Sequence, residues 1–234
     1  MKAKLGIVAA TWAFAAGLLS AGGGHAQTAT PKAEKLQVDL VNSRVYIKVT
    51  SSTRLGHDHG VVGHLESGTA TPGSGGKLVF AMKTFITDTA EARRYVGLNA
   101  PIKAADQKKS SENMLGADVL NVDRFPGATF EIKTFDPAEG QAVGAAGLYN
   151  LAGTFTLHGV AQPLKLGAKL EPTSDPAVTR LRGSFTILQS QFGITPYSAL
   201  GGLVGIEDKL KIWGEFVLRT PGARADAATP RVTR

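Results

Sequence analysis

Alternation between apolar and polar residues is strongest in residues 148–172. From Leu151 to Leu157 every second position is apolar or glycine, and the same period resumes from Leu164 to Leu170. A two-residue period is typical of a β-strand with one apolar face. The residues between the two runs include a glycine and a proline, which favour a turn over a continued strand. The segment therefore predicts a β-hairpin with an apolar inner face.

Most of the remaining chain repeats this strand pattern. Alternating segments occur at 36–40, 45–49, 78–82, 128–135, 181–187 and 210–218. Residues 88–120 lack the two-residue period and are rich in Ala, Lys, Gln and Glu, so we expect short helices at 90–95 and 106–115 with a break at 99–101. An antiparallel sheet of this size must stack on another sheet or close on itself. Closure predicts an all-β fold over residues 36–218, an extended antiparallel β-barrel of about eight strands with a short helical insertion.

The apolar faces of the strands are expected to meet inside the barrel. An eight-stranded barrel has room for packed side chains or for one slender ligand, so these residues either fill a core or line a cavity. The inward-facing residues are Val45, Ile47, Phe80, Met82, Phe130, Ile132, Phe155, Leu157, Phe185, Ile187, Ile212 and Phe216. Gly153, Gly183 and Gly214 also fall in inward positions, where glycine indicates either sharp sheet curvature or clearance for a ligand.

The N-terminal end of the chain departs from the strand pattern. Lys2 and Lys4 precede an uncharged apolar run and a small-residue stretch that ends at 24–26. This arrangement is typical of a secretory signal peptide, so we expect residues 1–26 to be cleaved and residues 27–35 to form a polar leader. The mature protein is then periplasmic or secreted, with no membrane span. A membrane anchor is the competing interpretation, although the apolar run is short for a spanning helix.

The net charge of +7 is concentrated at the two ends. Lys2 and Lys4 leave with the signal peptide, and residues 219–234 carry four Arg and one Asp, so the rest of the mature chain is only about +2. We expect residues 219–234 to be a disordered basic tail, and we expect no nucleic-acid partner, because no basic face interleaved with aromatic residues accompanies the tail. The chain has no cysteine, which excludes disulfides and a lipid-modified cysteine.

Three histidines form the one chemically suggestive cluster in the sequence. His57, His59 and His64 follow one another closely, and three imidazoles brought together would suit zinc, copper or nickel. The spacing is not specific for a metal site, so we interpret these residues as solvated loop histidines or as part of a local hydrogen-bonded turn. His158 lies at the turn of the predicted hairpin and is interpreted as a turn residue.

No catalytic constellation appears elsewhere. The sequence has no nucleophile triad, phosphate-binding loop or helical zinc motif, so we expect a protein without enzymatic activity and without a cofactor. A metal-dependent enzyme or a redox accessory that uses His57, His59 and His64 is the alternative. The charged run of Asp88, Glu91 and Arg93 is interpreted as the outer face of a short helix.

Several longer motifs carry a family resemblance. Residues 117–121, Ala-Asp-Val-Leu-Asn, and residues 125–130, Phe-Pro-Gly-Ala-Thr-Phe, resemble the "ADFLN…YPxATF" signature of the YceI-like family. The hairpin at 153–164 is similar to the family's "GxLTLxGVTxPV" motif, and residues 191–194 resemble its late "DFxI" element. The chain departs from the family in its first strands, because residues 44–49 lack the histidine of the family's "SxVxFxVxH" strand.

The resemblance implies a lipocalin-like barrel that holds a long apolar lipid, of the polyisoprenoid or isoprenoid-quinone class, without catalysis. It also implies that the inward apolar residues named above, together with Gly153, form the ligand-binding site. On this basis we expect a periplasmic or secreted lipid-binding protein, either monomeric or a homodimer.

Overall fold

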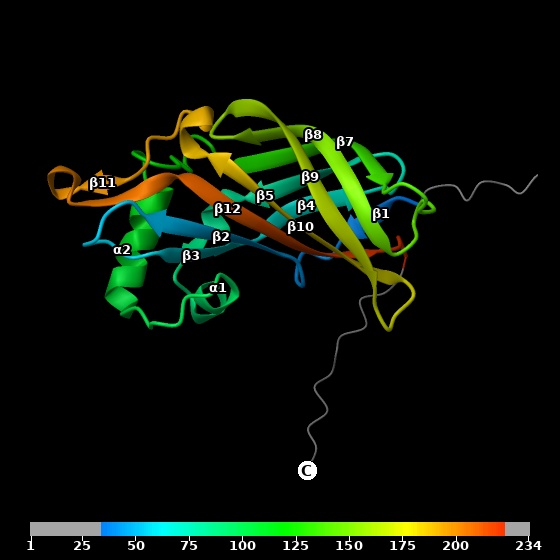
Figure 1. The fold of residues 1–234 in the computed structure, drawn as a ribbon, viewed down its shortest axis with the longest axis horizontal. Helices are drawn as coiled ribbons and strands as arrows, with labels where there is room; N and C mark the ends of the chain where they lie inside the picture. Colours follow the sequence, from blue (N-terminus) through cyan, green and yellow to red (C-terminus); the bar gives the residue numbers. More distant parts are fainter. Residues whose placement is uncertain (1–33, 223–234) are drawn as a thin grey trace, which may run out of the picture. The chain divides into compact units, whose positions relative to one another are not determined.

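β-Strands dominate the part of the chain that the computed structural model describes, residues 34–222 (Figure 1). The expected signal peptide, the leader up to residue 33 and the tail beyond residue 222 lie outside the described residues, and these expectations stay predictions. Between residues 34 and 222, no helix is both long enough and apolar enough to cross a membrane.

The elements follow the predicted order, with short strands added between the long ones. The strands are β1 (Leu36–Val38), β2 (Arg44–Ser51), β3 (His59–Gly63), β4 (Leu65–Ala70), β5 (Gly76–Ala81), β6 (Ile86–Thr87), β7 (Gly127–Pro137), β8 (Gly147–Leu157), β9 (Val160–Pro172), β10 (Val178–Leu188), β11 (Ser198–Ala199) and β12 (Val204–Arg219). The helices are α1 (Ala90–Tyr95) and α2 (Ala104–Leu115), with 3₁₀ turns η1 (Met82–Thr84), η2 (Gln189–Phe192) and η3 (Leu200–Gly202). The predicted range of the first helix is confirmed, and the second helix begins slightly before its predicted start.

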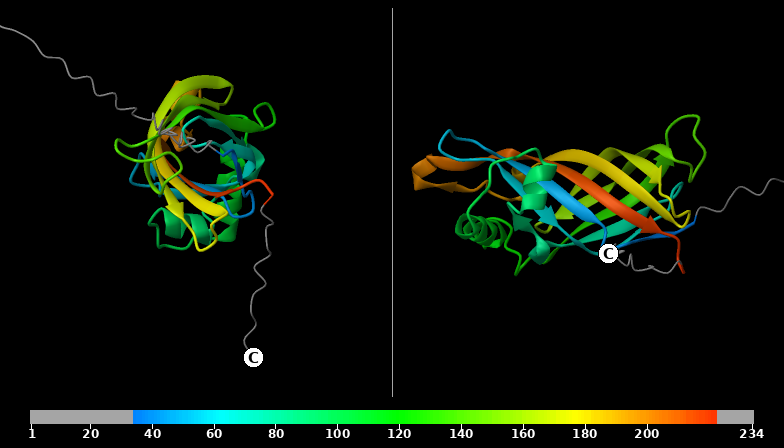
Figure 2. Two further views of the ribbon diagram at one scale, coloured as in Figure 1. Left: turned by 90° about the vertical axis from the view of Figure 1, so that its right-hand side faces the viewer. Right: turned by 90° about the horizontal axis from the view of Figure 1, so that it is seen from below.

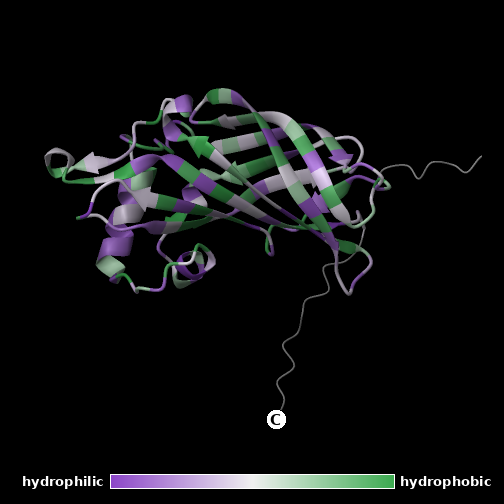
Figure 3. Ribbon diagram, viewed as in Figure 1, coloured by the Kyte–Doolittle hydropathy of each residue, from purple (hydrophilic) through white to green (hydrophobic). Residues whose placement is uncertain are grey.

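The long strands close into an antiparallel barrel of eight strands, which confirms the predicted fold class. β5, β7, β8, β9, β10, β12 and β2 pair in succession; β3 pairs with β2 and β4 pairs with β5, so β3 and β4 together supply the eighth strand. β1 pairs with both β4 and β12 where the barrel closes. The left view of Figure 2 shows the strands as a ring, and Figure 3 shows apolar and polar residues alternating along them.

The predicted central hairpin is confirmed as β8 and β9. Leu157 pairs with Val160, so the turn consists of His158 and Gly159 alone. Both turn residues have positive φ, 52° and 77°, which is the requirement of a type I′ turn and matches the twist of the flanking strands. His158 therefore has the turn role that its position in the sequence predicted, and its Nδ1 lies 3.2 Å from the carbonyl oxygen of Phe192.

One end of the barrel is filled with side chains. Phe135 and Leu218 have no exposed surface, and Tyr149 has 1%. The rings of Phe135 and Tyr149 meet edge to face with centroids 4.9 Å apart, and the Tyr149 hydroxyl donates to the carbonyl oxygen of Ala145 at 2.9 Å. Close packing of this kind leaves no room for a ligand, so this end of the barrel is blind.

The last strand runs one residue further than predicted. β12 ends at Arg219, which pairs with Gln37 in β1. The Arg219 Nε atom lies 2.8 Å from Asp39 Oδ2 in a partly buried ion pair. Arg219 therefore belongs to the barrel and not to the basic tail, because the strand pairing and the carboxylate hold it in place.

Candidate functional site

A cavity of about 190 Å³ lies inside the barrel. Every barrel strand contributes to its wall, with Leu78 from β5, Phe130 from β7, Phe155 from β8, Leu166 from β9, Phe185 from β10, Ile212 from β12, Val45 from β2 and Val61 from β3. The residues that fill the blind end, Phe135, Tyr149 and Leu218, do not line the cavity. The space therefore excludes the blind end and extends toward the region where β2 ends and β3 begins.

The cavity brings together all but two of the residues that were predicted to bind the ligand. These are Val45, Ile47, Phe80, Met82, Phe130, Phe155, Leu157, Phe185, Ile187, Ile212 and Phe216. Their placement follows from the strand period, which directs every second side chain inward. Their contact with a ligand stays a prediction.

Ile132 and Gly153 do not line the cavity, contrary to the prediction. They pair with each other across β7 and β8, next to the irregularity in register between Ile132 and Thr134. Ile132 is 5% exposed and packs within the apolar core. A Cβ atom on Gly153 would meet the carbonyl oxygen of Glu131 and not the lumen. Gly153 thus permits the close approach of the two strands, which corresponds to the curvature interpretation.

Gly183 and Gly214 do line the cavity, and they are cross-strand partners in β10 and β12. A Cβ atom on Gly214 would come within 2.5 Å of the Phe216 ring, and one on Gly183 would come within 2.9 Å of Leu166. The two glycines therefore let neighbouring large side chains lie flat against the barrel wall. Glycine at these positions leaves space for the Phe216 ring and the Leu166 side chain along the wall.

Aromatic rings form much of the apolar surface inside the barrel. The Phe155 ring makes edge contacts with the rings of Phe80, Phe185 and Phe192, at centroid distances of 6.4, 5.8 and 5.6 Å. Rings in this geometry attract one another beyond their burial of area. They give the lumen a stiff wall that fits a slender apolar chain.

Polar residues enter the lining where β3 begins and β10 ends. They are His59, Thr87, Ser110, Asn113, Gln189 and Tyr197. Asn113 on α2 donates from Nδ2 to the Tyr197 hydroxyl at 3.2 Å, and Gln189 donates to the carbonyl oxygen of Glu207 at 2.9 Å. Among the described residues, the lining includes no Lys, Arg, Asp or Glu. This end of the cavity is thus lined by polar side chains without a carboxylate, ammonium or guanidinium group.

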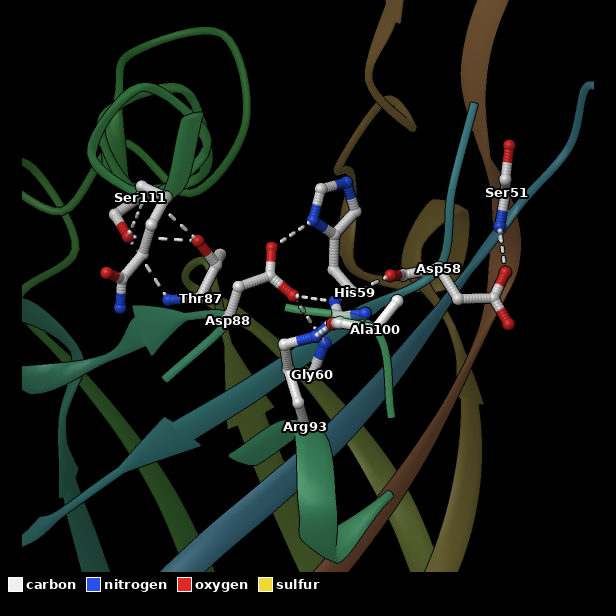
Figure 4. A network of polar contacts seen from close by, with 10 residues as sticks. Ser51, Asp58, His59, Gly60, Thr87, Asp88, Arg93, Ala100 and Ser111 are labelled. Atoms are coloured by element: carbon white, nitrogen blue, oxygen red, sulfur yellow. Dashed lines mark hydrogen bonds and ion pairs between the residues drawn. The ribbon is translucent and has the colours of Figure 1, made fainter. Parts of the chain in front are cut away.

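Behind His59 lies a network of buried charges (Figure 4). The His59 Nδ1 atom lies 2.5 Å from Asp88 Oδ2, and the Arg93 guanidinium donates to Asp88 Oδ1 at 2.7 Å. The backbone N–H of Gly60 also donates to Asp88, at 3.2 Å. Arg93 is in turn held by the carbonyl oxygen of Ala100 at 2.7 Å. Asp88 and Arg93 together fix the orientation of the His59 ring.

The protonation of Asp88 follows from these contacts. Burial by itself would raise the pKa of Asp88, because it disfavours the charged form. Hydrogen bonds from His59 and Arg93 outweigh burial and hold the pKa of this carboxyl below its ordinary value. Asp88 is therefore a carboxylate at neutral pH, and it can only accept hydrogen bonds.

The prediction that Asp88 and Arg93 form an exposed outer face is wrong. Asp88 is 5% and Arg93 is 7% exposed, whereas Glu91 is exposed as predicted. Asp88 precedes α1 in a left-handed conformation, φ 54°, and this turn directs its carboxylate back toward Arg93 and Gly60. The charge run alone could not distinguish a solvated helix face from a buried ion pair that spans the start of the helix.

His57, His59 and His64 do not come together in one cluster, as the alternative metal-dependent function would require. His57, His59 and Asp88 have potential ligand atoms within 4.8 Å of one another, and the rings of His57 and His59 lie 4.5 Å apart. His64 lies beyond the opposite end of β3, roughly 16 Å along the strand at 3.3 Å per residue. The remaining three groups fit a cation poorly, because the Arg93 guanidinium already neutralises Asp88 at 2.7 Å.

Comparisons with known proteins agree with this architecture. Residues 36–218 match the sequence model of the YceI-like domain. A solved polyisoprenoid-binding domain from Saccharophagus degradans, implicated in plant cell wall breakdown, is 15% identical with a TM-score of 0.57, over 81% of this chain and 100% of that one. BcnA from Burkholderia cenocepacia is 16% identical with a TM-score of 0.50, over 77% and 98% of the two chains.

At such low identity, these two structures are similar to the present chain in fold alone. A comparison with curated protein sequences found no significant match. The sequence match nevertheless covers the whole barrel, from β1 almost to the end of β12. The chain belongs to the YceI-like domain family.

Proposed function

We propose that this protein is a periplasmic or secreted carrier that holds one long-chain polyisoprenoid or similar lipid in its lumen and catalyses no reaction. The single observation that carries the proposal is a cavity walled by apolar side chains from all eight barrel strands and closed at one end. The polyisoprenoid-binding domain from Saccharophagus degradans has a similar fold, which supports the same class of ligand.

Burial of an isoprenoid chain needs no polar partner. Each buried CH₂ group contributes roughly 0.8 kcal/mol, so ten carbons contribute about 8 kcal/mol, equivalent to a micromolar dissociation constant before ordering costs. Selectivity for such a ligand then depends on the length and width of the cavity. A filled core would bind nothing, however apolar its residues.

The direct test is mass spectrometry of an organic extract of protein purified without delipidation. We expect a long apolar lipid in near-stoichiometric amount. Ala128→Leu and Leu210→Trp, which enlarge lining residues, should remove that lipid while the barrel stays folded by circular dichroism. Leu188→Trp is the matched control, because Leu188 is 39% exposed and does not line the cavity.

Two results would contradict the carrier. Native protein that contains no lipid and takes up none after delipidation would show that the lumen is only an imperfectly packed core. A stoichiometric metal that is lost in His57→Ala would favour the metal-dependent alternative instead.

A further inference from the structure

The lumen has one feature that a purely apolar chain would not use, the imidazole of His59. The Nδ1 atom of the ring contacts Asp88, whereas Nε2 has no hydrogen-bond partner among the described residues (Figure 4). His59 lines the cavity, and its side chain is 18% exposed. Among the described residues, every fully buried side-chain nitrogen or oxygen has a hydrogen-bond partner. Nε2 has no such partner, so it is not fully buried and reaches open space.

The contact with Asp88 determines what Nε2 can do. A carboxylate only accepts hydrogen bonds, so the proton between the two groups resides on Nδ1. In the neutral ring, Nε2 then carries a lone pair and accepts a hydrogen bond. Asp88 is itself held by Arg93 at 2.7 Å and by the N–H of Gly60 at 3.2 Å, which prevents the ring from turning over.

The other residues that line the polar end limit which head group of a ligand can hydrogen-bond to His59. Among the described residues, no Lys or Arg lines the cavity, and a buried phosphate or carboxylate without a cation would be strongly destabilised. The lining therefore fits a neutral head group better than an anionic one. The Tyr197 hydroxyl accepts from Asn113 and keeps its own proton to donate. A group that both donates and accepts fits this end of the lumen, and an alcohol is the simplest such group.

We propose that His59 binds the terminal hydroxyl of a long-chain isoprenoid alcohol, with Nε2 as the acceptor and with Asp88 and Arg93 as positioning residues. The inference rests on the proposed function, since the chain of the same ligand occupies the apolar lumen. The apolar part of the cavity then receives the tail of the alcohol, and the polar end receives its hydroxyl.

The test compares two probes of equal length. Delipidated protein is titrated at pH 8.5, above the range in which histidine ordinarily titrates, with a C20 isoprenoid alcohol and with its methyl ether, which lacks the O–H donor. The wild type should bind the alcohol about tenfold more tightly than the ether, because the ether leaves Nε2 without a partner. His59→Leu should bind both probes with equal affinity.

Two further variants separate recognition from folding. His57→Ala is the matched control, because His57 is exposed and does not line the cavity, and it should keep the tenfold preference. Asp88→Asn offers an amide donor to Nδ1, which moves the ring proton to Nε2 and should abolish the preference while the ether still binds. A purely structural role of Asp88 would weaken both probes equally.

The possible failures are distinguishable. Wild-type protein that binds neither probe would contradict the carrier itself. Equal binding of the two probes to the wild type, or a preference that survives His59→Leu, would overturn the head-group proposal and leave the carrier intact. Zinc bound at one equivalent and lost in His59→Leu would assign the imidazole to a metal instead.

Discussion

The buried ion pair between Asp88 and Arg93 is a single contact on which the polar end of the lumen depends. The two side chains are 0% and 8% exposed, so neither can be solvated if its partner is lost. Removal of one partner from a buried pair is strongly destabilising, because the other charge remains in the interior. The pair also holds His59, so its loss would affect both stability and the lumen.

Arg93→Leu should lower the free energy of unfolding at pH 7 by roughly 3 kcal/mol, the usual magnitude when a buried pair is broken. The folded-state pKa of Asp88 lies below the ordinary value of 3.8, so the stabilisation by this carboxylate is present above pH 3.8 and is lost as the pH falls through the folded pKa. The difference between wild type and variant should therefore shrink in acid. Urea unfolding at pH 7 and pH 3 measures both effects.

Arg94→Leu is the control for this experiment, because Arg94 is the next residue on the same helix and is exposed. We expect no measurable change from it at either pH. A difference between wild type and Arg93→Leu that stays constant down to pH 3 would mean that the effect does not pass through the Asp88 carboxylate.

The close pairing of β7 with β8 depends on a single glycine, Gly153. Gly153 lies opposite Ile132, where the register of β7 shifts before Thr134. The backbone of Glu131 approaches Gly153 so closely that no side chain fits between them. The local bend of the barrel wall therefore requires a residue without a Cβ atom.

Gly153→Ala should destabilise the barrel by about 1–3 kcal/mol, as overpacking commonly does, without a direct effect on ligand contacts. Gly167→Ala is the matched control, because Gly167 lies in the neighbouring strand β9 and a Cβ atom there would meet nothing within 4 Å. Thermal unfolding of the two delipidated variants compares them. Equal melting midpoints of the two variants would show that β7 and β8 accommodate the added methyl group at residue 153 without loss of stability.

At the scale of the whole molecule, the barrel of residues 36–219 has one filled end and one end where polar residues join the lining of the cavity. The predicted signal peptide, residues 1–26, lies outside the described part of the chain. Export would place this barrel in a compartment where a lipid otherwise has to cross water.

Export predicts that the mature protein begins at Gln27. Expression of the full-length chain in a Gram-negative host, followed by N-terminal sequencing of the periplasmic fraction, should give Gln27 or a residue within one or two positions of it. Met1 on a species that is recovered only by membrane extraction would favour an uncleaved anchor. Sedimentation of the same material distinguishes a monomer from a homodimer.

The hydrophobic period was sufficient to predict the long strands and their inner faces. Alternation at 151–157 and 164–170 predicted β8 and β9, and Gly159 indicated the turn between them, whereas Pro163 lies within β9. β3 and β4 escaped the pattern because Gly60, Gly63 and Gly68 interrupt their alternation. The β-sheet propensity of these glycine-containing segments is weak, and they become strands because β3 pairs with β2 and β4 pairs with β5.

The sequence by itself determined the all-β class, the two short helices, the central hairpin and most of the residues that face the lumen, because each depends on neighbours within a few positions. Only the tertiary structure decided that Ile132 and Gly153 do not line the cavity, that Asp88 and Arg93 are buried together, and that His59 and not His64 reaches the lumen. These outcomes depend on register and burial between segments far apart in the chain, and a local pattern of apolar and charged residues carries no information about such distances.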